Sequence, residues 1–240
     1  MENAPYPPEW GNDCLSEFLQ AMHENTFCRF VHDKQLFTRL GEIAEAYGPV
    51  ISHLSGASDW FAALFIPRAH SAWLAGVRLA LGGQPPEAYA VLRACLENSL
   101  YCFYLSGNSE RAETFLRKHD DDAWFRKMRN EFRPSRFLNL LRQTNERAAR
   151  VASVLYQRTI DYGAHPNPRA LLTSMCMSDV NGRRHVDVGY TALDPAALAL
   201  CFTTGAQIGI SSLDIIAIAE PNLFQDAGFG ERLDKLRQGL

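Results

Sequence analysis

The chain has 240 residues, of which 47% are hydrophobic, and its formal net charge at pH 7 is −3. A chain of this length and composition can bury a sizeable core, so a disordered protein is not expected. The net charge gives no overall attraction to nucleic acid or to an anionic membrane, although a local basic patch would escape this count. The start, MENAPYPPEW, lacks the basic and apolar regions of a signal peptide, and residues 1–12 are expected to form an extended tail.

Six cysteines are scattered along the chain without a CxxC pair, most of them among apolar residues. A reduced thiol in such surroundings behaves as a small hydrophobic group, so the pattern indicates a reducing compartment. Because the start also lacks a signal peptide, we expect a cytoplasmic protein.

Two apolar stretches have the length of a membrane span. Residues 60–83 carry two arginines, a histidine and a central proline, which is typical of a core helix. Residues 196–219 are more apolar and long enough to cross a bilayer. A lone apolar helix near the end of a chain is more simply a buried core element, so we expect no membrane contact.

Apolar residues recur at three- and four-residue spacing over most of the chain, which is the pattern of amphipathic helices. Asp13, Asp33 and Asp59 are suited to cap helix N-termini, and other helices are predicted to begin at prolines. The predicted helical segments are 13–47, 59–83, 85–106, 109–127, 134–165 and the residues from 195 onward.

Residues 174–191 (SMCMSDVNGRRHVDVGYT) have a different pattern. Apolar and polar residues alternate on both sides of Asn181-Gly182, a pair that accepts the positive φ angles of a type I′ turn. This predicts a β-hairpin. The expected fold is therefore all-α, a bundle of about eight or nine helices with one inserted hairpin, and residues 13–240 are expected to form a single domain.

Several common functional motifs are absent. The sequence contains no GxxxxGK[ST], GxGxxG, HExxH or GxSxG, and the lack of Glu-x-x-His disfavours a ferritin-like di-iron site. The runs HDDD at 119–122 and HD at 32–33 combine histidine with carboxylates, as metal-dependent phosphohydrolases do. A solvated, charged helix face is the more ordinary interpretation, so we expect neither a metal nor another cofactor.

Arg158 and His165 form the first candidate site. They are two helical turns apart, so an unbroken helix places both on one side, with Tyr162 near the same line. Gly163 and Pro166 place the histidine at a helix C-terminus, whose dipole raises the imidazole pKa toward neutrality. Such a pair suits an RNA phosphodiester, because the histidine can transfer a proton while the guanidinium holds phosphate oxygens. It also suits plain anion binding, or a surface arginine beside a histidine that caps the last carbonyls.

A second polar group lies within the apolar stretch 88–105, where only Arg93, Glu97 and one asparagine are strongly polar. A helix this apolar should be buried. Arg93 and Glu97 are four positions apart and can pair, and Tyr101 continues roughly the same side. Because a buried ion pair is costly to desolvate, it is expected to orient another group such as His165, although a purely structural pair fits equally.

The stretches LRACLENSLYCFYL and YQRTIDYGAHPNPRALL resemble the HEPN (higher eukaryotes and prokaryotes nucleotide-binding) superfamily, particularly its larger bacterial helical members. HEPN domains are helical bundles, often homodimers, and many contain an Arg-x(4–6)-His motif that serves metal-independent RNA cleavage in toxins and defence systems. Arg158 and His165, with six residues between them, match this spacing. Thr159 and Pro166 depart from the residues usual in active ribonucleases, which leaves ligand-binding members without catalysis open.

The resemblance implies a HEPN-like helical homodimer that binds or cleaves RNA, with a role in toxin or defence systems. In the enzymatic version it is a metal-independent endoribonuclease in which Arg158 holds phosphate and His165 transfers protons, in a cleft shared by two protomers. Five further residues are expected to support them or to bind ligand: Arg93, Glu97, Tyr101, Tyr162 and Asn167. The alternative is a non-catalytic module that binds a nucleotide or small anion, or a dimeric protein-interaction module. No DNA-specific motif is present.

Overall fold

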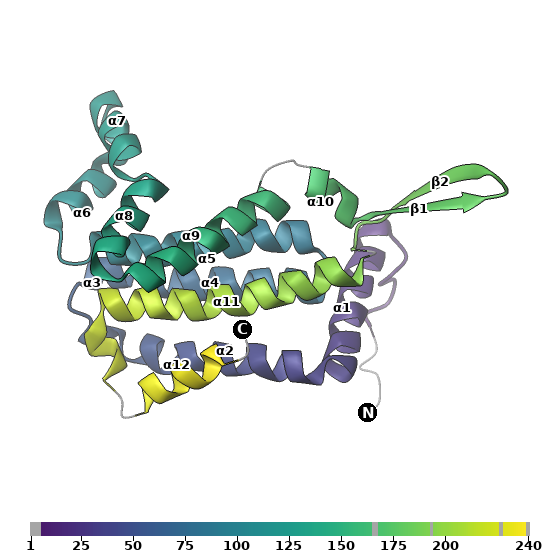
Figure 1. Cartoon of the computed structure of the whole chain (residues 1–240), viewed down its shortest axis with the longest axis horizontal. Coiled ribbons are helices and arrows are strands. Elements are labelled where there is room, and N and C mark those ends of the chain that lie inside the picture. The colour runs from purple at the N-terminus through teal and green to yellow at the C-terminus, as the bar shows by residue number, and fades with distance from the viewer. Residues whose placement is uncertain (1–5, 165–167, 193, 226–227, 239–240) are drawn as a thin grey trace.

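Three long helices form the centre of the structure: α4 (Phe65–Leu81), α5 (Pro85–Leu105) and α11 (Pro195–Ala219) (Figure 1). The computed structural model describes residues 6–164, 168–192, 194–225 and 228–238. The other α-helices, in chain order, are α1 (Cys14–His32), α2 (Lys34–Ser52), α3 (Trp60–Ala63), α6 (Ser109–Leu116), α7 (Asp122–Glu131), α8 (Pro134–Thr144), α9 (Glu146–Thr159), α10 (Pro168–Thr173) and α12 (Phe229–Arg237).

The remaining helices surround this centre (Figure 1). α2 and α12 lie on one side of α4 and α11, and α9 lies on the other side, against α5 and α11. α1 stands across one end of the bundle, and α6, α7 and α8 are gathered at the opposite end. α9 and α11 are thereby neighbours, although 35 residues, 160–194, lie between them in sequence.

α11 is largely enclosed, because α2, α4, α5 and α9 all pack on it. The indole Nε1 of Trp73 donates a hydrogen bond to the carbonyl of Gly205 at 2.8 Å. One turn further along, a Cβ at Gly209 would collide with the Trp73 ring, so glycine is required for this close helix contact. By length and composition α11 could cross a membrane, and 67% of its most apolar window is buried, as is typical of a core helix.

The helix predicted over 134–165 is divided in the structure. It is interrupted at Asn145, whose side chain accepts a hydrogen bond from the backbone N–H of Ala148 at 3.0 Å and caps α9. At its other end α9 gives way to a π-helix, Ile160–Ala164. The prediction of one unbroken helix was wrong. A single asparagine does not disturb the apolar periodicity on which the prediction rested, but its side chain can bond to backbone groups in place of the helical hydrogen bonds.

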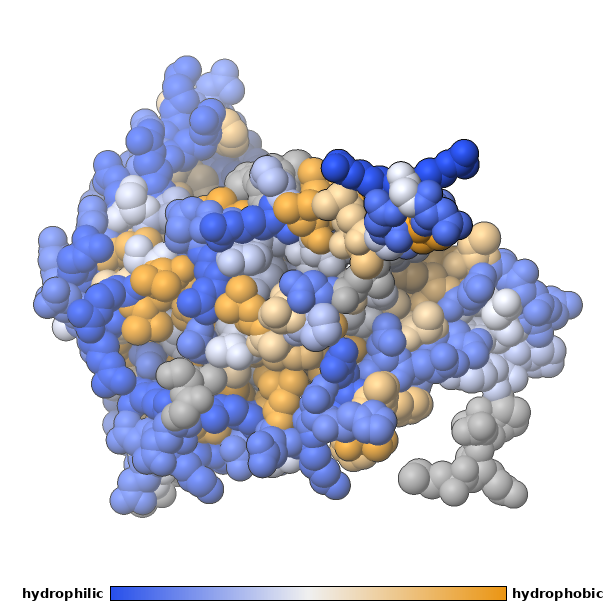
Figure 2. Space-filling model, turned by 45° about the vertical axis from the view of Figure 1, so that its right-hand side comes forward, coloured by the Kyte–Doolittle hydropathy of each residue, from blue (hydrophilic) through white to orange (hydrophobic). Residues whose placement is uncertain are grey.

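The predicted hairpin is confirmed, and with it the all-α bundle that contains one inserted hairpin. Strands β1 (Met175–Val180) and β2 (Arg183–Val188) pair antiparallel around Asn181 and Gly182, which have φ angles of 56° and 74°. The hairpin projects from the end of the bundle near α1 and α10 (Figure 1). Figure 2, in which this end comes forward, shows a mostly hydrophilic surface with apolar patches between the charged side chains.

Candidate functional site

The predicted Arg93–Glu97 pair forms, and it is shared with α9. Arg93 Nε donates to Glu97 Oε1 at 2.9 Å and Nη2 donates to the Tyr156 hydroxyl at 2.6 Å. The Tyr156 hydroxyl donates in turn to Glu97 Oε1 at 3.0 Å. Burial and the nearby Glu97 carboxylate raise the pKa of Tyr156 to about 12, so this hydroxyl remains a donor at neutral pH. The triad joins α5 to α9.

α5 carries two of the predicted site residues, Glu97 and Tyr101. Glu97 is engaged by Arg93 and Tyr156, which supports the structural interpretation of the pair. Tyr101 packs in an aromatic cluster, with its ring centroid 5.4 Å from that of Phe132 and 5.1 Å from that of Phe137. Tyr101 therefore belongs to the core between α5 and α8.

Arg158 lies at the C-terminal end of α9 and reaches toward α11. Its Nη1 donates to Thr204 Oγ1 at 3.1 Å and to Gln207 Oε1 at 2.8 Å. Within the described residues its Nε and Nη2 atoms make no hydrogen bond, and the partly buried side chain lines a groove. Arg158 is therefore held in place by one nitrogen while two others remain available to a ligand.

Tyr162 lies in the π-helix that follows Arg158. Its ring centroid is 5.4 Å from that of Tyr89, and the Arg169 guanidinium lies over the ring and donates to the hydroxyl at 3.3 Å. The other predicted members of this group, His165 and Asn167, lie outside the described residues.

The π-helix Ile160–Ala164 packs directly on the start of α5. A Cβ at Gly163 would overlap the backbone carbonyl of Pro86 and would lie 2.7 Å from the Cβ of Tyr89. Only glycine permits this approach, so Gly163 fixes the end of α9 against α5. Single-turn π-helices are frequent at functional sites, and this one begins two residues after Arg158.

Tyr89 lies beside Tyr162 and near Arg158, and the sequence reasoning did not single it out. Its side chain is 1% exposed, and its hydroxyl has no hydrogen-bond partner among the described residues. Burial raises the pKa of this hydroxyl, and the nearby Thr204 hydroxyl and Arg158 guanidinium partly offset that rise. In the sequence, Tyr89 could have been identified by its position four residues before Arg93, which places both side chains on the same side of one helix.

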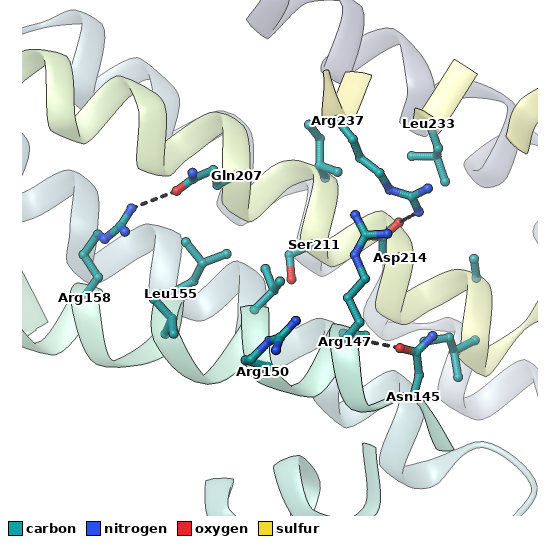
Figure 3. A pocket seen from close by; sticks show the side chains of 16 residues that line it. Asn145, Arg147, Arg150, Leu155, Arg158, Gln207, Ser211, Asp214, Leu233 and Arg237 are labelled. Atoms are coloured by element: carbon teal, nitrogen blue, oxygen red, sulfur yellow. Dashed lines mark hydrogen bonds and ion pairs between the residues drawn. The ribbon is translucent and has the colours of Figure 1, made fainter. Parts of the chain in front are cut away.

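A groove of about 760 Å³ runs between α9 and α11, and α12 contributes Leu233 and Arg237 to its lining (Figure 3). It is lined by Asn145, Arg147, Ala148, Arg150, Val151, Val154, Leu155, Arg158, Gln207, Ile210, Ser211, Asp214, Ala217, Ile218, Leu233 and Arg237.

The α9 wall of the groove is a ladder of arginines with valines between them. Arg147, Arg150 and Arg158 recur at spacings that keep them on one face of the helix, and Val151 and Val154 between them are 40% and 54% exposed. Figure 3 shows Arg147 and Arg150 extending from α9 toward α11. The groove therefore combines positive charge with an accessible apolar surface.

The only acidic side chain that lines the groove, within the described residues, is Asp214 on α11. It accepts a hydrogen bond from Arg237, at the opposite end from Arg158 (Figure 3). Burial raises the pKa of Asp214, and Arg237 and Arg147 act against that rise. Because Arg237 already balances this carboxylate, the charges of Arg147, Arg150 and Arg158 are left in excess.

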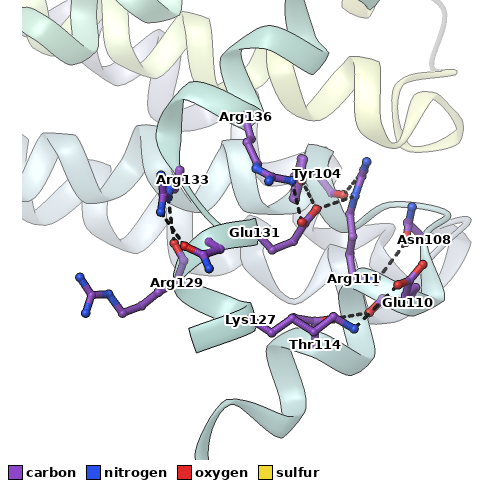
Figure 4. A network of polar contacts seen from close by, with 11 residues as sticks. Tyr104, Asn108, Glu110, Arg111, Thr114, Lys127, Arg129, Glu131, Arg133 and Arg136 are labelled. Carbon is purple, nitrogen blue, oxygen red and sulfur yellow. Dashed lines mark hydrogen bonds and ion pairs between the residues drawn. The ribbon is translucent and has the colours of Figure 1, made fainter. Parts of the chain in front are cut away.

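The arginine ladder belongs to a basic stretch that the overall charge conceals. Residues 126–158 contain nine Lys or Arg and two Asp or Glu, a net charge of +7 in a chain whose net charge is −3. Some of these charges are neutralised locally, because Glu131 pairs with Arg136 and with Arg111 beside the Tyr104 hydroxyl (Figure 4). Arg147 and Arg150 have no ion pair among the described residues. A charge count over residues 126–158 could have identified this basic surface from the sequence.

The acidic run at 119–122 has structural roles instead. Asp121 caps α7 by accepting hydrogen bonds from the N–H groups of Ala123 and Trp124, and Asp120 pairs with Arg117. Within the described residues, no group of three or more His, Cys, Asp or Glu side chains is placed to hold a metal ion.

Comparison of the chain with protein-family models, with characterised proteins and with solved structures finds no match. The proposed function therefore rests on the chemistry of the groove.

Proposed function

We propose that the protein binds single-stranded RNA in the groove between α9 and α11. The observation that carries this proposal is the ladder of Arg147, Arg150 and Arg158, which leaves uncompensated guanidinium groups beside exposed valines. Arginine holds phosphate oxygens through paired N–H donors, and apolar surface suits the faces of unstacked bases. Both features are needed for a nucleic acid strand, whereas a simple inorganic anion needs only the first.

The length of the ladder supports a strand over a single phosphate. Arg147 and Arg158 are eleven residues apart, and at about 1.5 Å per residue their Cα atoms are separated by roughly 16 Å. A nucleotide could occupy one end of such a groove, near Arg158 and Gln207. A strand of several nucleotides could contact all three arginines, so we place RNA first and a mononucleotide second.

Binding to Arg158 is tested by fluorescence anisotropy with a labelled single-stranded RNA of a dozen nucleotides. Arg158→Ala removes charge-assisted hydrogen bonds of about 1.5–3 kcal/mol each, so the affinity should fall about ten- to a hundredfold. Arg68→Ala, an exposed arginine on α4, is the matched control and should bind like the native protein. Unchanged affinity of Arg158→Ala would place the RNA elsewhere.

The same titration separates strand from mononucleotide. If a mononucleotide present in equal concentration displaces the RNA, the occupant is a single nucleotide and the second candidate function holds. If displacement needs a large excess, contacts along the ladder contribute to the affinity, as expected for a strand.

We further propose a HEPN-like catalytic role, which rests on the resemblance and on the Arg158–His165 spacing. In this role His165 removes the proton from a ribose 2′-hydroxyl, and the 2′-oxygen attacks the adjacent phosphorus. The P–O5′ bond breaks, the 5′-oxygen takes a proton from water, and the products are a 2′,3′-cyclic phosphate and a 5′-hydroxyl. Arg158 stabilises the negative charge on the phosphate oxygens.

Cleavage is tested with mixed RNA in the presence of EDTA. The native protein should produce fragments, and His165→Ala should lower the rate at least a hundredfold while leaving RNA affinity within a few fold, because general acid–base catalysis contributes roughly 10²–10⁴ to a rate. No cleavage by the native protein, or equal cleavage by the variant, would leave a non-catalytic RNA-binding module.

A further inference from the structure

The polar side chains of α11 gather on the side of the helix that lines the groove. Gln207 and Asp214 are the only charged or amide residues in this apolar helix, and both line the groove with Ser211 between them. The three positions are four and three residues apart, so they form one stripe along the helix. α11 therefore presents a polar stripe to the same groove whose α9 wall carries the arginine ladder.

Ser211 has no partner for its hydroxyl group. The residue is 3% exposed, and its hydroxyl makes no hydrogen bond with any residue that the structure describes. Two neighbouring hydroxyls of α11 are satisfied, because Ser212 and Ser99 bond to each other and Thr204 donates to a backbone carbonyl. Figure 3 shows the Ser211 oxygen pointing toward α9, into the groove. Because a buried hydroxyl without a hydrogen bond is costly, its partner has to come from the groove.

Asp214 is held through one oxygen and can still accept hydrogen bonds. Arg237 donates to Asp214 Oδ1, and Oδ2 accepts no hydrogen bond from the part of the chain that the structure describes. A carboxylate has about four lone-pair sites, so the bond to Arg237 orients the group without filling it. Figure 3 shows Asp214 across the groove from Arg147. α11 thus offers a hydroxyl and a carboxylate to a strand whose phosphates lie on the ladder.

We propose that Ser211 and Asp214 select guanine among the bases of a bound strand, a specificity that rests on the proposed RNA binding. The Asp214 carboxylate accepts hydrogen bonds from N1–H and from the 2-amino group of the base. The Ser211 hydroxyl donates to the neighbouring O6 atom.

The order of donors and acceptors favours guanine over the other three bases. Guanine carries two adjacent donors, N1–H and the 2-amino group, next to the acceptor O6, and this order matches a carboxylate followed by a hydroxyl. Adenine and cytosine have one amino group beside a ring nitrogen that accepts, and uracil has one N–H between two carbonyls. Each of these three bases would place an acceptor against the carboxylate, which is unfavourable and adds to the discrimination.

The apolar lining of the groove suits the faces of the base. Val151 and Val154 are exposed on the α9 wall, and Ile210 also lines the groove. The volume of about 760 Å³ lies within the range of small-molecule sites, so it can hold a base with its ribose and phosphate. The guanine edge then faces α11 while the phosphate contacts Arg147 or Arg150.

The native protein tests this specificity without any substitution. Fluorescence anisotropy is measured with oligouridine of a dozen nucleotides and with the same strand carrying one central guanine, adenine or cytosine. The guanine strand should bind about tenfold more tightly than the other three, because a matched bidentate contact discriminates between bases by at least about this factor. Inosine, which lacks only the 2-amino group, should recover only part of the preference. Equal binding of the four strands would overturn the proposed specificity, as would inosine that binds as tightly as guanine.

Two carboxylates that pair with the same arginine provide a variant and its matched control. Asp214→Asn keeps the size of the side chain and loses the charge and one acceptor oxygen, so the guanine preference should fall to within about twofold. Asp234→Asn removes the other carboxylate that pairs with Arg237, lies outside the groove and should keep the full preference. Ser211→Ala loses the bond to O6 and should lower the preference about threefold. A full preference in Asp214→Asn, or its loss in Asp234→Asn, would overturn the assignment to Asp214.

Oligouridine binding, and its loss in Arg158→Ala, report RNA binding independently of base preference. A native protein that binds all four strands equally would lose the guanine specificity and keep the proposed function. A native protein that binds none of the strands would overturn both.

Discussion

Replacing Gly163 with alanine is expected to lower the free energy of unfolding by about 2–3 kcal/mol, because overpacking of a closed contact costs this much when the backbone has to move. The added methyl group would overlap the Pro86 carbonyl oxygen and crowd Tyr89, and the overlapped atom is backbone that cannot rotate away. For a chain of this length the melting temperature should fall by roughly 5–10 °C. Thermal unfolding followed by circular dichroism measures the change.

Gly230→Ala is the matched control for this prediction. Gly230 lies in the first turn of α12, and a Cβ there would meet nothing within 4 Å. Alanine has the higher helix propensity, so the control should unfold at the native temperature or slightly above it. Equal melting temperatures for Gly163→Ala and Gly230→Ala would show that the π-helix does not pack tightly on α5.

The sequence was informative wherever the signal is local. The hairpin depends on Asn181-Gly182 and on the alternation beside it, and both lie within one short segment. Asp13 and Asp59 accept hydrogen bonds from the N–H groups they were predicted to cap, whereas Asp33 makes no such cap and pairs with Arg29. The cap at Asp33 failed because the preceding helix supplies a cationic competitor, which spacing alone does not show.

The candidate site was predictable only within single helices. The spacing of Arg93 and Glu97 predicted their pairing, but their third partner, Tyr156, comes from α9 and depends on how two helices pack. Arg147 and Arg150 look like an ordinary solvated helix face in the sequence. They become part of a groove because α11 lies beside α9, and that contact joins segments with 35 residues between them.

Reversing two charges of the ladder, Arg147→Glu with Arg150→Glu, is expected to lower RNA affinity at least about a hundredfold at low salt, because phosphate contacts dominate such affinities. The two guanidinium groups form no ion pair among the described residues, so their loss exposes no partner. The glutamates also lie in the first turns of α9, where the helix dipole favours negative charge. The melting temperature should therefore stay within a few degrees of the native value, although Asp214 would face one added carboxylate.

The control for the double reversal has the same change in net charge at a different place. Lys34→Glu with Arg68→Glu alters two exposed residues of α2 and α4, outside the groove, and should reduce RNA affinity only slightly. The salt dependence distinguishes the two variants further. Each lost phosphate contact lowers the slope of log affinity against log salt by about 0.7 for a single strand, so the ladder variant should show a shallower slope and the control the native one. Equal losses in both variants would mean that RNA responds to the net charge of the chain, and the groove between α9 and α11 would then not be its binding site.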